Sequence, residues 1–257
     1  VPMSDDLRGL LEYYRDLGIK TLYRRAAPAA AVTPAIAVEP GPPPAPEPAA
    51  FEPPMPKPIE LPSLQPSDDT MLKILADIGD CRRCRLHQGR NKIVFGSGNE
   101  QSPLVFVGEG PGADEDVQGL PFVGRAGQLL TQMIDNTASK EGIRITRASV
   151  YICNVVKCRP PENRTPEPDE MEICGQFLFR QLMVMKPKAI VALGGTAAKA
   201  LLGAREGVTK MRGKWHSWRD IQVMVTYHPS YLLRPYNQNA KREAWEDLKK
   251  ALHYVYD

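Results

Sequence analysis

Short apolar runs alternate along the chain with longer segments in which apolar residues recur every three or four positions. The short runs are rich in Val, Ile and Leu and predict buried strands at 104–107, 150–156, 189–193 and 222–226. The longer segments predict amphipathic helices at 68–78, 126–138, 167–185, 196–202 and 239–254. Strands that alternate with helices predict an α/β fold, a single three-layer domain with a mostly parallel sheet covered on both faces.

The first 66 residues follow a different pattern. Residues 4–25 carry leucines at helical spacing on one face, which predicts an amphipathic helix within a first part, 1–25. Residues 26–66 contain 14 of the 25 prolines and many alanines, so this Pro/Ala-rich part is expected to be a disordered, extended linker. The globular domain then spans 67–257. The N-terminal helix is a candidate docking element for a protein partner, with packing back on the domain as the alternative.

Charge is unevenly distributed between these parts. The net charge is +3 overall, but it is +5 within residues 67–257 and −2 in the first 66 residues. The basic residues of the domain form clusters at Arg82, Arg83, Arg85; Lys157, Arg159, Arg164; Lys210, Arg212, Lys214; and Lys241, Arg242. Such clusters suit the phosphate backbone of a nucleic acid, with a solvated basic surface as the alternative for any single cluster.

Other features of the composition bear on the compartment. No apolar run approaches the roughly 20 residues that a membrane-spanning helix needs, so no membrane association is expected. The five cysteines are odd in number and unevenly spaced, which argues against a secreted disulfide framework. We therefore expect a protein of the reduced, cytoplasmic compartment.

The strand at 104–107 runs into a glycine turn, Gly108-Glu-Gly-Pro-Gly112, and several acidic residues follow it. Glycines allow a tight turn whose backbone can approach a ligand closely. A buried strand that delivers such a turn to its carboxyl end is typical of the sites of α/β sheets. A plain surface loop is the alternative, and the G-x-G-x-G spacing disfavours a dinucleotide site.

Four cysteines are candidate metal ligands. Cys81 and Cys84 form a CxxC pair, and Cys158 and Cys174 are separated by fifteen residues. Four thiolates can hold a zinc ion or an iron–sulfur cluster, and the wide second pair fits a cluster at least as well as a zinc ribbon. The fifth thiol, Cys153, lies within a predicted strand, which favours a small buried hydrophobe.

Taken together, the motifs resemble those of the family 4 uracil-DNA glycosylases, the iron–sulfur branch of the uracil-DNA glycosylase superfamily. The resemblance covers about residues 78–254. Its motifs are Cys81-x2-Cys84, Gly108-Glu-Gly-Pro-Gly-Ala-Asp-Glu-Asp116, Pro121-Phe-Val-Gly-Arg-Ala-Gly127, Asn154-Val-Val-Lys-Cys-Arg-Pro-Pro161, Cys174 and His228-Pro-Ser-Tyr-Leu-Leu-Arg234. It implies a central four-stranded parallel sheet and a [4Fe–4S] cluster on Cys81, Cys84, Cys158 and Cys174.

The implied activity is hydrolysis of the N-glycosidic bond of deoxyuridine in single- or double-stranded DNA, which leaves an abasic site for base excision repair. We expect the protein to act as a monomer. A glycosylase must flip its base out of the stack and hold it in a pocket. By the resemblance, Phe122 stacks on the flipped uracil, and the amide of Asn154 matches the O4/N3 edge of uracil but not cytosine. His228 then donates to O2 as negative charge builds on the leaving base.

The resemblance implies further roles around this pocket. Glu115 crowds the C5 position and excludes thymine, Leu232 wedges into the gap left by the flipped base, and Arg234 contacts phosphate. Gly110 stands where some branches of the superfamily carry a water-activating aspartate. We therefore expect Glu109 or backbone carbonyls to orient the attacking water.

One related branch bonds covalently to DNA through a histidine on an inserted loop. Residues 159–173 contain no histidine, so we expect turnover. Two other functions remain as alternatives. One is a metal-stabilised DNA-binding module without catalysis, which would not depend on Asn154 or His228. The other is a nucleotide-binding enzyme that uses Gly194-Gly195-Thr196, although the chain has no G-x-x-x-x-G-K-[ST] motif.

Overall fold

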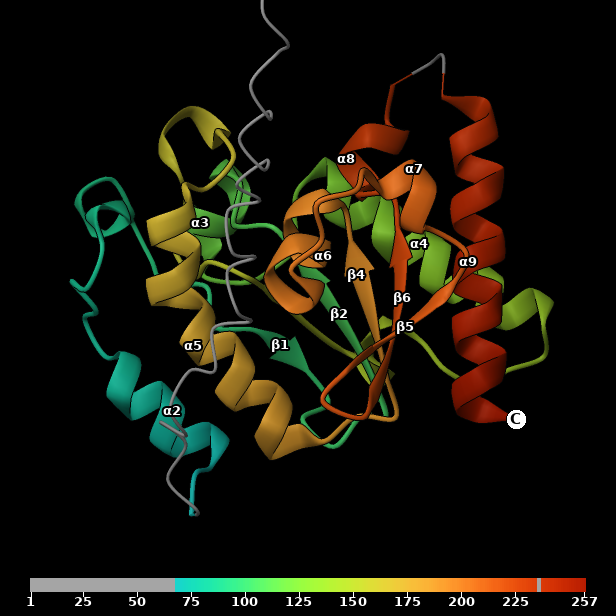
Figure 1. Ribbon diagram of the computed structural model, residues 1–257, viewed down its shortest axis with the longest axis horizontal. Coiled ribbons are helices and arrows are strands. Elements are labelled where there is room, and N and C mark those ends of the chain that lie inside the picture. Colours follow the sequence, from blue (N-terminus) through green and yellow to red (C-terminus); the bar gives the residue numbers. More distant parts are fainter. Residues whose placement is uncertain (1–67, 235–236) are drawn as a thin grey trace, which may run out of the picture. The chain divides into compact units, whose positions relative to one another are not determined.

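The computed structural model describes residues 68–234 and 237–257. The predicted helix at 4–25 and the predicted linker at 26–66 lie outside these residues. The six strands are β1 Ser97–Gly98, β2 Leu104–Gly108, β3 Tyr151–Asn154, β4 Ala189–Leu193, β5 Trp215–Trp218 and β6 Ile221–Thr226. They form one sheet in the order β1-β3-β2-β4-β6-β5 (Figure 1).

The four central strands are parallel, as the sequence indicated, but the expected sheet of four strands gains two antiparallel edges. Strand β1 pairs with β3, and β5 pairs with β6. Strand β1 has two residues, which is too short for a hydrophobic pattern. Strand β5 reads Trp-His-Ser-Trp without polar alternation, and it turns into β6 through Arg219 and Asp220, both at positive φ. This geometry is that of a two-residue hairpin turn.

Eight α-helices and three short 3₁₀-helices surround the sheet in the described part of the chain. The α-helices are α2 Met71–Ile78, α3 Ala113–Gln118, α4 Arg125–Lys140, α5 Pro168–Met185, α6 Gly195–Leu202, α7 Val208–Met211, α8 Pro229–Leu232 and α9 Gln238–Tyr256. The 3₁₀-helices are η1 Arg85–Gln88, η2 Arg147–Ser149 and η3 Pro161–Asn163. The sequence did not predict α3, α7 and α8, because helices of four to six residues show no periodicity.

The core lies on both faces of the sheet. Leu104 and Phe106 of β2 pack with apolar residues of α4 and α9, whereas Val105 and Val107 pack with α2, α5 and α6. This alternation follows from the two-residue period of a strand, and it produces the predicted three layers (Figure 1). Within the described ranges, none of the helices combines the length and the apolar character needed to cross a bilayer.

The order of the parallel strands defines the place of a site. Strand β2 lies between β3 and β4. The connection that leaves β2 leads to β3 on one side of it, and the connection that leaves β3 leads to β4 on its other side. Open α/β sheets bind ligands in the crevice at such a switch point. The segments that follow β2, β3, β4 and β6 meet there.

Helix α2 is clamped to α5 by charged groups. Arg180 of α5 forms a bidentate pair with Asp69 at 2.7 and 2.9 Å and a further pair with Asp77. Thr70 caps α2 by accepting from the backbone N–H of Lys73. Because α2 leads directly into the CxxC segment, this clamp sets where that segment meets α5.

Candidate active site

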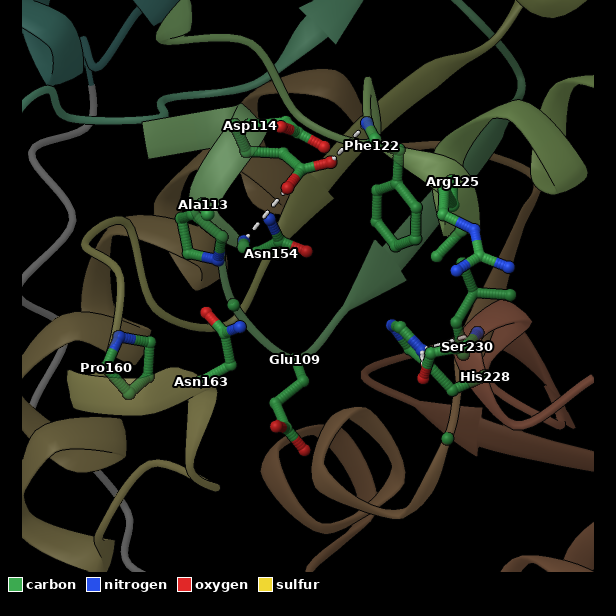
Figure 2. Close-up of a pocket in the computed structure, with 18 of the residues that line it drawn as sticks. Glu109, Ala113, Asp114, Phe122, Arg125, Asn154, Pro160, Asn163, His228 and Ser230 are labelled. Atoms are coloured by element: carbon green, nitrogen blue, oxygen red, sulfur yellow. Dashed lines mark hydrogen bonds between the residues drawn. The ribbon is translucent and has the colours of Figure 1, made fainter. Parts of the chain in front are cut away.

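A pocket of about 460 Å³ opens at the carboxyl ends of the parallel strands. Figure 2 shows its lining side chains, which come from the turn after β2, the loop before α4, the end of β3 and the start of α8. Six residues that the sequence analysis assigned to the site line this pocket: Glu109, Gly110, Glu115, Phe122, Asn154 and His228. The fold therefore gathers side chains that lie far apart in the sequence.

Asn154 ends β3 and is only 1% exposed. It stands in register with Gly108, the last residue of β2. A Cβ atom at Gly108 would lie 2.4 Å from Asn154 Oδ1 and 2.5 Å from Phe122 Cζ, so glycine leaves the room that both side chains occupy. Within the described residues, Asn154 Oδ1 is buried without a hydrogen-bond partner. Buried acceptors are normally paired. An unpaired one in a residue that lines a pocket therefore indicates a place for the hydrogen-bond donor of a ligand.

Phe122 forms an aromatic wall of the pocket (Figure 2). Its φ of +54° lies in the left-handed region, which a non-glycine residue adopts at an energetic cost. Gly127 permits this conformation, because a Cβ atom there would lie 1.9 Å from the carbonyl oxygen of Phe122. The surrounding structure thus holds a strained residue with its ring beside the cavity.

His228 precedes α8 and serves as its N-cap. Its Nδ1 accepts from the backbone N–H of Ser230 at 3.2 Å and lies 2.8 Å from Ser230 Oγ. Because Nδ1 accepts, the neutral imidazole carries its proton on Nε2. Burial lowers the pKa of His228 to about 4, although the nearby Glu115 carboxylate acts in the opposite direction. The ring is therefore a neutral N–H donor at pH 7.

Glu115 anchors the two loops that carry the pocket wall. One carboxylate oxygen accepts from the backbone N–H of Gly112 at 3.0 Å, and the other accepts from Val123 and Gly124, each at 2.9 Å. These bonds tie α3 to the residues that directly follow Phe122. The role at C5 of the base stays a prediction, while the contacts show that Glu115 positions the Phe122 loop.

Glu109 lines the pocket at the turn after β2, and its carboxylate accepts from the hydroxyl of Thr196 on α6. The Gly194-Gly195-Thr196 motif therefore belongs to this pocket, where both glycines also line the cavity. At Gly110, a Cβ atom would lie 2.7 Å from Val156 Cγ2. The aspartate of other branches would thus require Val156 to move.

The sequence analysis missed pocket residues in the segment after β3. Pro160 and Asn163 line the pocket, and Figure 2 shows Asn163 across the cavity from His228. Asn163 has a φ of +57°, and Arg159 Nε donates to its Oδ1 at 2.8 Å. The available signal was an asparagine after two prolines, since asparagine tolerates this conformation better than most residues. Arg125, at the start of α4, also lines the pocket.

The structure does not place Leu232 where a wedge is expected. Leu232 is 1% exposed and packs with Ala240 and Ala244 of α9, because it faces inward from α8. Tyr231, which is 39% exposed, is the large side chain that α8 presents to solvent. Arg234 is exposed, as a phosphate contact requires, and its guanidinium lies 5.7 Å from the centre of the Tyr231 ring.

The four candidate metal ligands line one small hollow away from the pocket. Cys81 and Cys84 come from the loop after α2, Cys158 follows β3, and Cys174 lies on α5. All are free thiols, and the fifth cysteine, Cys153, is buried within β3 outside this lining. Across the described ranges, no group of three or more His, Cys, Asp or Glu side chains is placed to hold a metal ion.

Hydrogen-bond donors point at two of these sulfurs. Arg90 Nη1 donates to Cys158 Sγ at 3.4 Å, and the backbone N–H of Lys157 donates to Cys174 Sγ at 3.2 Å. Burial raises the pKa of Cys174 to about 12 and also raises the pKa of Cys158. A bound cation reverses this effect and deprotonates coordinating thiols. Four thiols, two of which accept from N–H donors, are the type of ligand that a soft metal centre uses.

Glu170 connects the cysteine segment to the pocket. This fully buried carboxylate on α5 pairs with Arg164 at 2.7 and 2.8 Å and with Arg85 Nε at 2.8 Å. It also accepts from the backbone N–H of Glu167 at 2.8 Å. The Arg164 hydrogen bonds are the main cause that lowers the pKa of Glu170 to about 2. Glu170 therefore holds together the CxxC segment and the loop that carries Asn163.

Comparison with known proteins agrees with the resemblance that the sequence motifs indicate. The family model described as "Uracil DNA glycosylase superfamily" matches residues 95–249. A type-4 uracil-DNA glycosylase of Thermotoga maritima is 45% identical over 190 residues, which cover 73% of this chain and 96% of that protein. One from Archaeoglobus fulgidus is 42% identical over 185 residues, 69% of this chain and 89% of that protein. A type-5 uracil-DNA glycosylase of Pyrobaculum aerophilum is 38% identical over 106 residues, 40% of this chain and 44% of that protein.

Proposed function

This chain belongs to the uracil DNA glycosylase superfamily, and we propose that it hydrolyses the N-glycosidic bond of deoxyuridine in DNA. The observation that carries the proposal is the buried Oδ1 of Asn154, which has no hydrogen-bond partner among the residues that the structure describes; Asn154 lines the same pocket as Phe122 and His228. Such a group is costly to bury unless a ligand completes its hydrogen bonds. The product is an abasic site for base excision repair.

The base is selected by the edge that faces Asn154. An amide offers one acceptor and one donor side by side, which complements the N3–H and O4 of uracil. Cytosine presents an unprotonated N3 and an amino group in their place, so both contacts are lost. Phe122 supplies the stacking surface, and Glu115 limits the space beside C5 both directly and through the loop that it anchors. A pocket discriminates a single methyl group by only about 1–3 kcal/mol, so thymine exclusion is partial in energetic terms.

Bond cleavage leaves negative charge on the uracil ring. The neutral imidazole of His228 donates its Nε2 proton in a hydrogen bond to O2, and this interaction strengthens as the glycosidic bond lengthens. Because Nδ1 is already engaged by Ser230, the ring cannot switch tautomer without breaking that contact. Glu109, held by Thr196, orients the water that attacks C1′. The chain contains glycine at position 110, so no aspartate contributes there.

The cysteine hollow is proposed to hold a [4Fe–4S] cluster through Cys81, Cys84, Cys158 and Cys174. When bound, the cluster supplies ligation energy that fastens the CxxC segment to β3 and α5, and such energy is folding energy. No catalytic step requires it. The N–H donors of Arg90 and Lys157 would stabilise the negative charge of the Cys158 and Cys174 thiolates.

Further parts of the proposal concern DNA and the N-terminal region. Tyr231 and Arg234 lie on the exposed side of α8 and the loop that follows, where they would contact the strand around the flipped nucleotide. We propose that the protein acts as a monomer in the cytoplasm. Residues 1–25 would dock a protein partner, and residues 26–66 would link them to the domain. Removal of residues 1–66 should then leave uracil excision intact.

A gel assay on a uracil-containing oligonucleotide, with enzyme in excess, tests the function. Wild-type protein should produce alkali-sensitive abasic sites opposite either G or A and in single strands. Asn154→Ala and His228→Ala should each lower the rate by about 10²–10³, as expected for loss of one transition-state hydrogen bond. A protein that binds the oligonucleotide but cleaves no glycosidic bond would favour the non-catalytic DNA-binding module.

A further inference from the structure

Lys157 is a fully buried lysine that the catalytic scheme above does not use. Its Nζ donates to the backbone carbonyl of Asn154 at 2.9 Å and to Gln181 Oε1 at 2.6 Å. The amide nitrogen of Gln181 donates in turn to the carbonyl of Phe95 at 3.1 Å and to the hydroxyl of Tyr151 at 3.3 Å. A lysine is rarely buried unless it is well paired, so this network has a structural purpose that a methionine could not serve.

The hydrogen bond from Lys157 to Asn154 lies at the end of β3, beyond the residues that pair with β1. The register of β1 with β3 reaches only Ile152, so β1 supplies no partner for Asn154. On the other side, the N–H of Val155 donates to the carbonyl of Gly108 at 2.9 Å and the N–H of Val156 donates to that of Glu109 at 3.2 Å, and neither bond involves the Asn154 carbonyl. The Lys157 ammonium therefore satisfies the Asn154 carbonyl, which would otherwise be a buried orphan acceptor.

The Asn154 side chain has no comparable anchor of its own. Its Oδ1 has no partner among the described residues, and its position depends on the backbone at 154 and on the space left by Gly108. A displacement of about 1 Å in a substrate-positioning group can cost roughly 10²-fold in rate. The group that fixes the Asn154 backbone is thus in a position to set the rate of base excision.

Lys157 also lies against the cysteine hollow. It lines that hollow, its backbone N–H donates to Cys174 Sγ, and Cys158 is the next residue. Its carbonyl accepts from the N–H of Val94 at 2.8 Å, which fixes the segment from a third side. One residue therefore bridges the predicted cluster ligands and the residue that contacts the base.

We propose that Lys157 is a positioning residue for catalysis, which holds the Asn154 backbone so that the Asn154 amide meets the base edge. This inference rests on the proposed uracil excision and adds a residue to it. Gln181 takes part by holding the Lys157 ammonium in place. The Lys157–Gln181 pair then affects the rate of the chemical step through the position of Asn154, and not through the stability of the fold.

A double-mutant cycle on the full-length protein tests this. Single-turnover excision is measured on a uracil-containing single strand for wild type, Lys157→Met, Asn154→Ala and the double variant. We expect Lys157→Met to lower the rate by about tenfold to a hundredfold, with affinity for 2′-fluorodeoxyuridine DNA within twofold of wild type. The same substitution should cause no further loss in the Asn154→Ala background. Visible absorbance and the thermal midpoint of each variant report whether the cysteine site and the fold persist.

Thr137→Val is the matched control, because Thr137 on α4 is a buried polar residue remote from this network. It should leave the excision rate unchanged.

If Lys157→Met does not fold, Gln181→Leu is used in the same cycle, since it removes a Lys157 partner without changing a neighbour of Cys158. Equal losses in the wild-type and Asn154→Ala backgrounds, or a wild-type rate in the Lys157 or Gln181 variant, overturn the inference. A wild-type protein that excises no uracil refutes the proposed function instead.

Discussion

The rings of Phe122 and His228 lie with their centroids 5.6 Å apart and their planes inclined by 36°. The two residues come from the loop before α4 and from the segment after β6, which lie far apart in the sequence. Their tilted arrangement lines one side of the pocket with an aromatic surface and an N–H donor together (Figure 2). Under the proposed mechanism, a base that stacks on Phe122 comes within reach of His228, so substrate binding and charge stabilisation would depend on the same loop geometry.

Gly108→Ala should abolish most of the activity while the protein remains folded. The new methyl group would overlap both Asn154 Oδ1 and Phe122 Cζ, so at least one of these side chains must move. We expect a loss of at least about 10²-fold in single-turnover rate, comparable to removal of a transition-state hydrogen bond. Gly207→Ala is the control, because a Cβ atom there meets nothing within 4 Å and its φ is negative. A near-normal rate in Gly108→Ala would contradict the close packing at the ends of β2 and β3.

The pH dependence of excision should show no protonation of His228 near its ordinary pKa of 6.5. Burial lowers the pKa of His228 to about 4, so the neutral donor persists well below neutrality. A histidine whose pKa falls on folding contributes stability that is complete above pH 6.5 and is lost as the pH falls toward 4. We expect the single-turnover rate to be flat from pH 8 to about 5 and to fall as pH 4 is approached.

A second histidine, His253, provides the control for this pH–rate profile. The carboxylates of Glu141 and Asp257 raise the pKa of His253, which lies on the surface of α9. His253→Gln should therefore leave the pH–rate profile unchanged. An acid limb centred near pH 6.5 in the wild type would show that the His228 ring is solvated in the working enzyme.

Leu232→Ala should act mainly on stability. Leu232 is buried between α8 and α9, and truncation of a buried leucine typically costs about 2–5 kcal/mol in the free energy of unfolding. Denaturant unfolding should show this loss, while excision from single-stranded DNA at low temperature stays close to wild type. Tyr231→Ala should show the reverse, with little loss of stability and slower excision from double-stranded than from single-stranded DNA. A Leu232→Ala protein of normal stability that fails only on duplex DNA would restore the wedge role to Leu232.

The cluster proposal predicts a brown protein that contains iron and sulfide. Cys158→Ser should lose the visible absorbance and much of the thermal stability, because the ligand joins three segments around the hollow. Cys153→Ser should retain the absorbance, since Cys153 lies within β3 outside the hollow. Iron, sulfide and zinc analysis after anaerobic purification is the measurement. Stoichiometric zinc without iron would replace the cluster by a zinc site.

Much of this protein follows from its sequence. The apolar runs predict the four central strands because buried parallel strands need uninterrupted apolar residues on both faces. His228 could be placed just beyond a strand end for the same reason, because one residue separates it from the run 222–226. Asn154 lies within the predicted run 150–156, and only the structure shows that β3 ends at this residue. The CxxC pair and the glycine turn were likewise visible, because thiol spacing and glycine content are local properties.

Other features depend on contacts between distant segments. Leu232 was expected to wedge into the gap left by a flipped base, but it packs against α9, and no local pattern in a four-residue helix reveals which face is covered. Glu115 is predicted to crowd C5 of the base, and the structure adds a role that no local pattern indicates, because its Oε1 accepts from backbone N–H groups of another loop. Lys157 reads as part of a basic cluster, but it is enclosed between β3 and α5. Burial and hydrogen-bond partners are decided by which segments meet in space, and the identity of a residue alone does not contain that information.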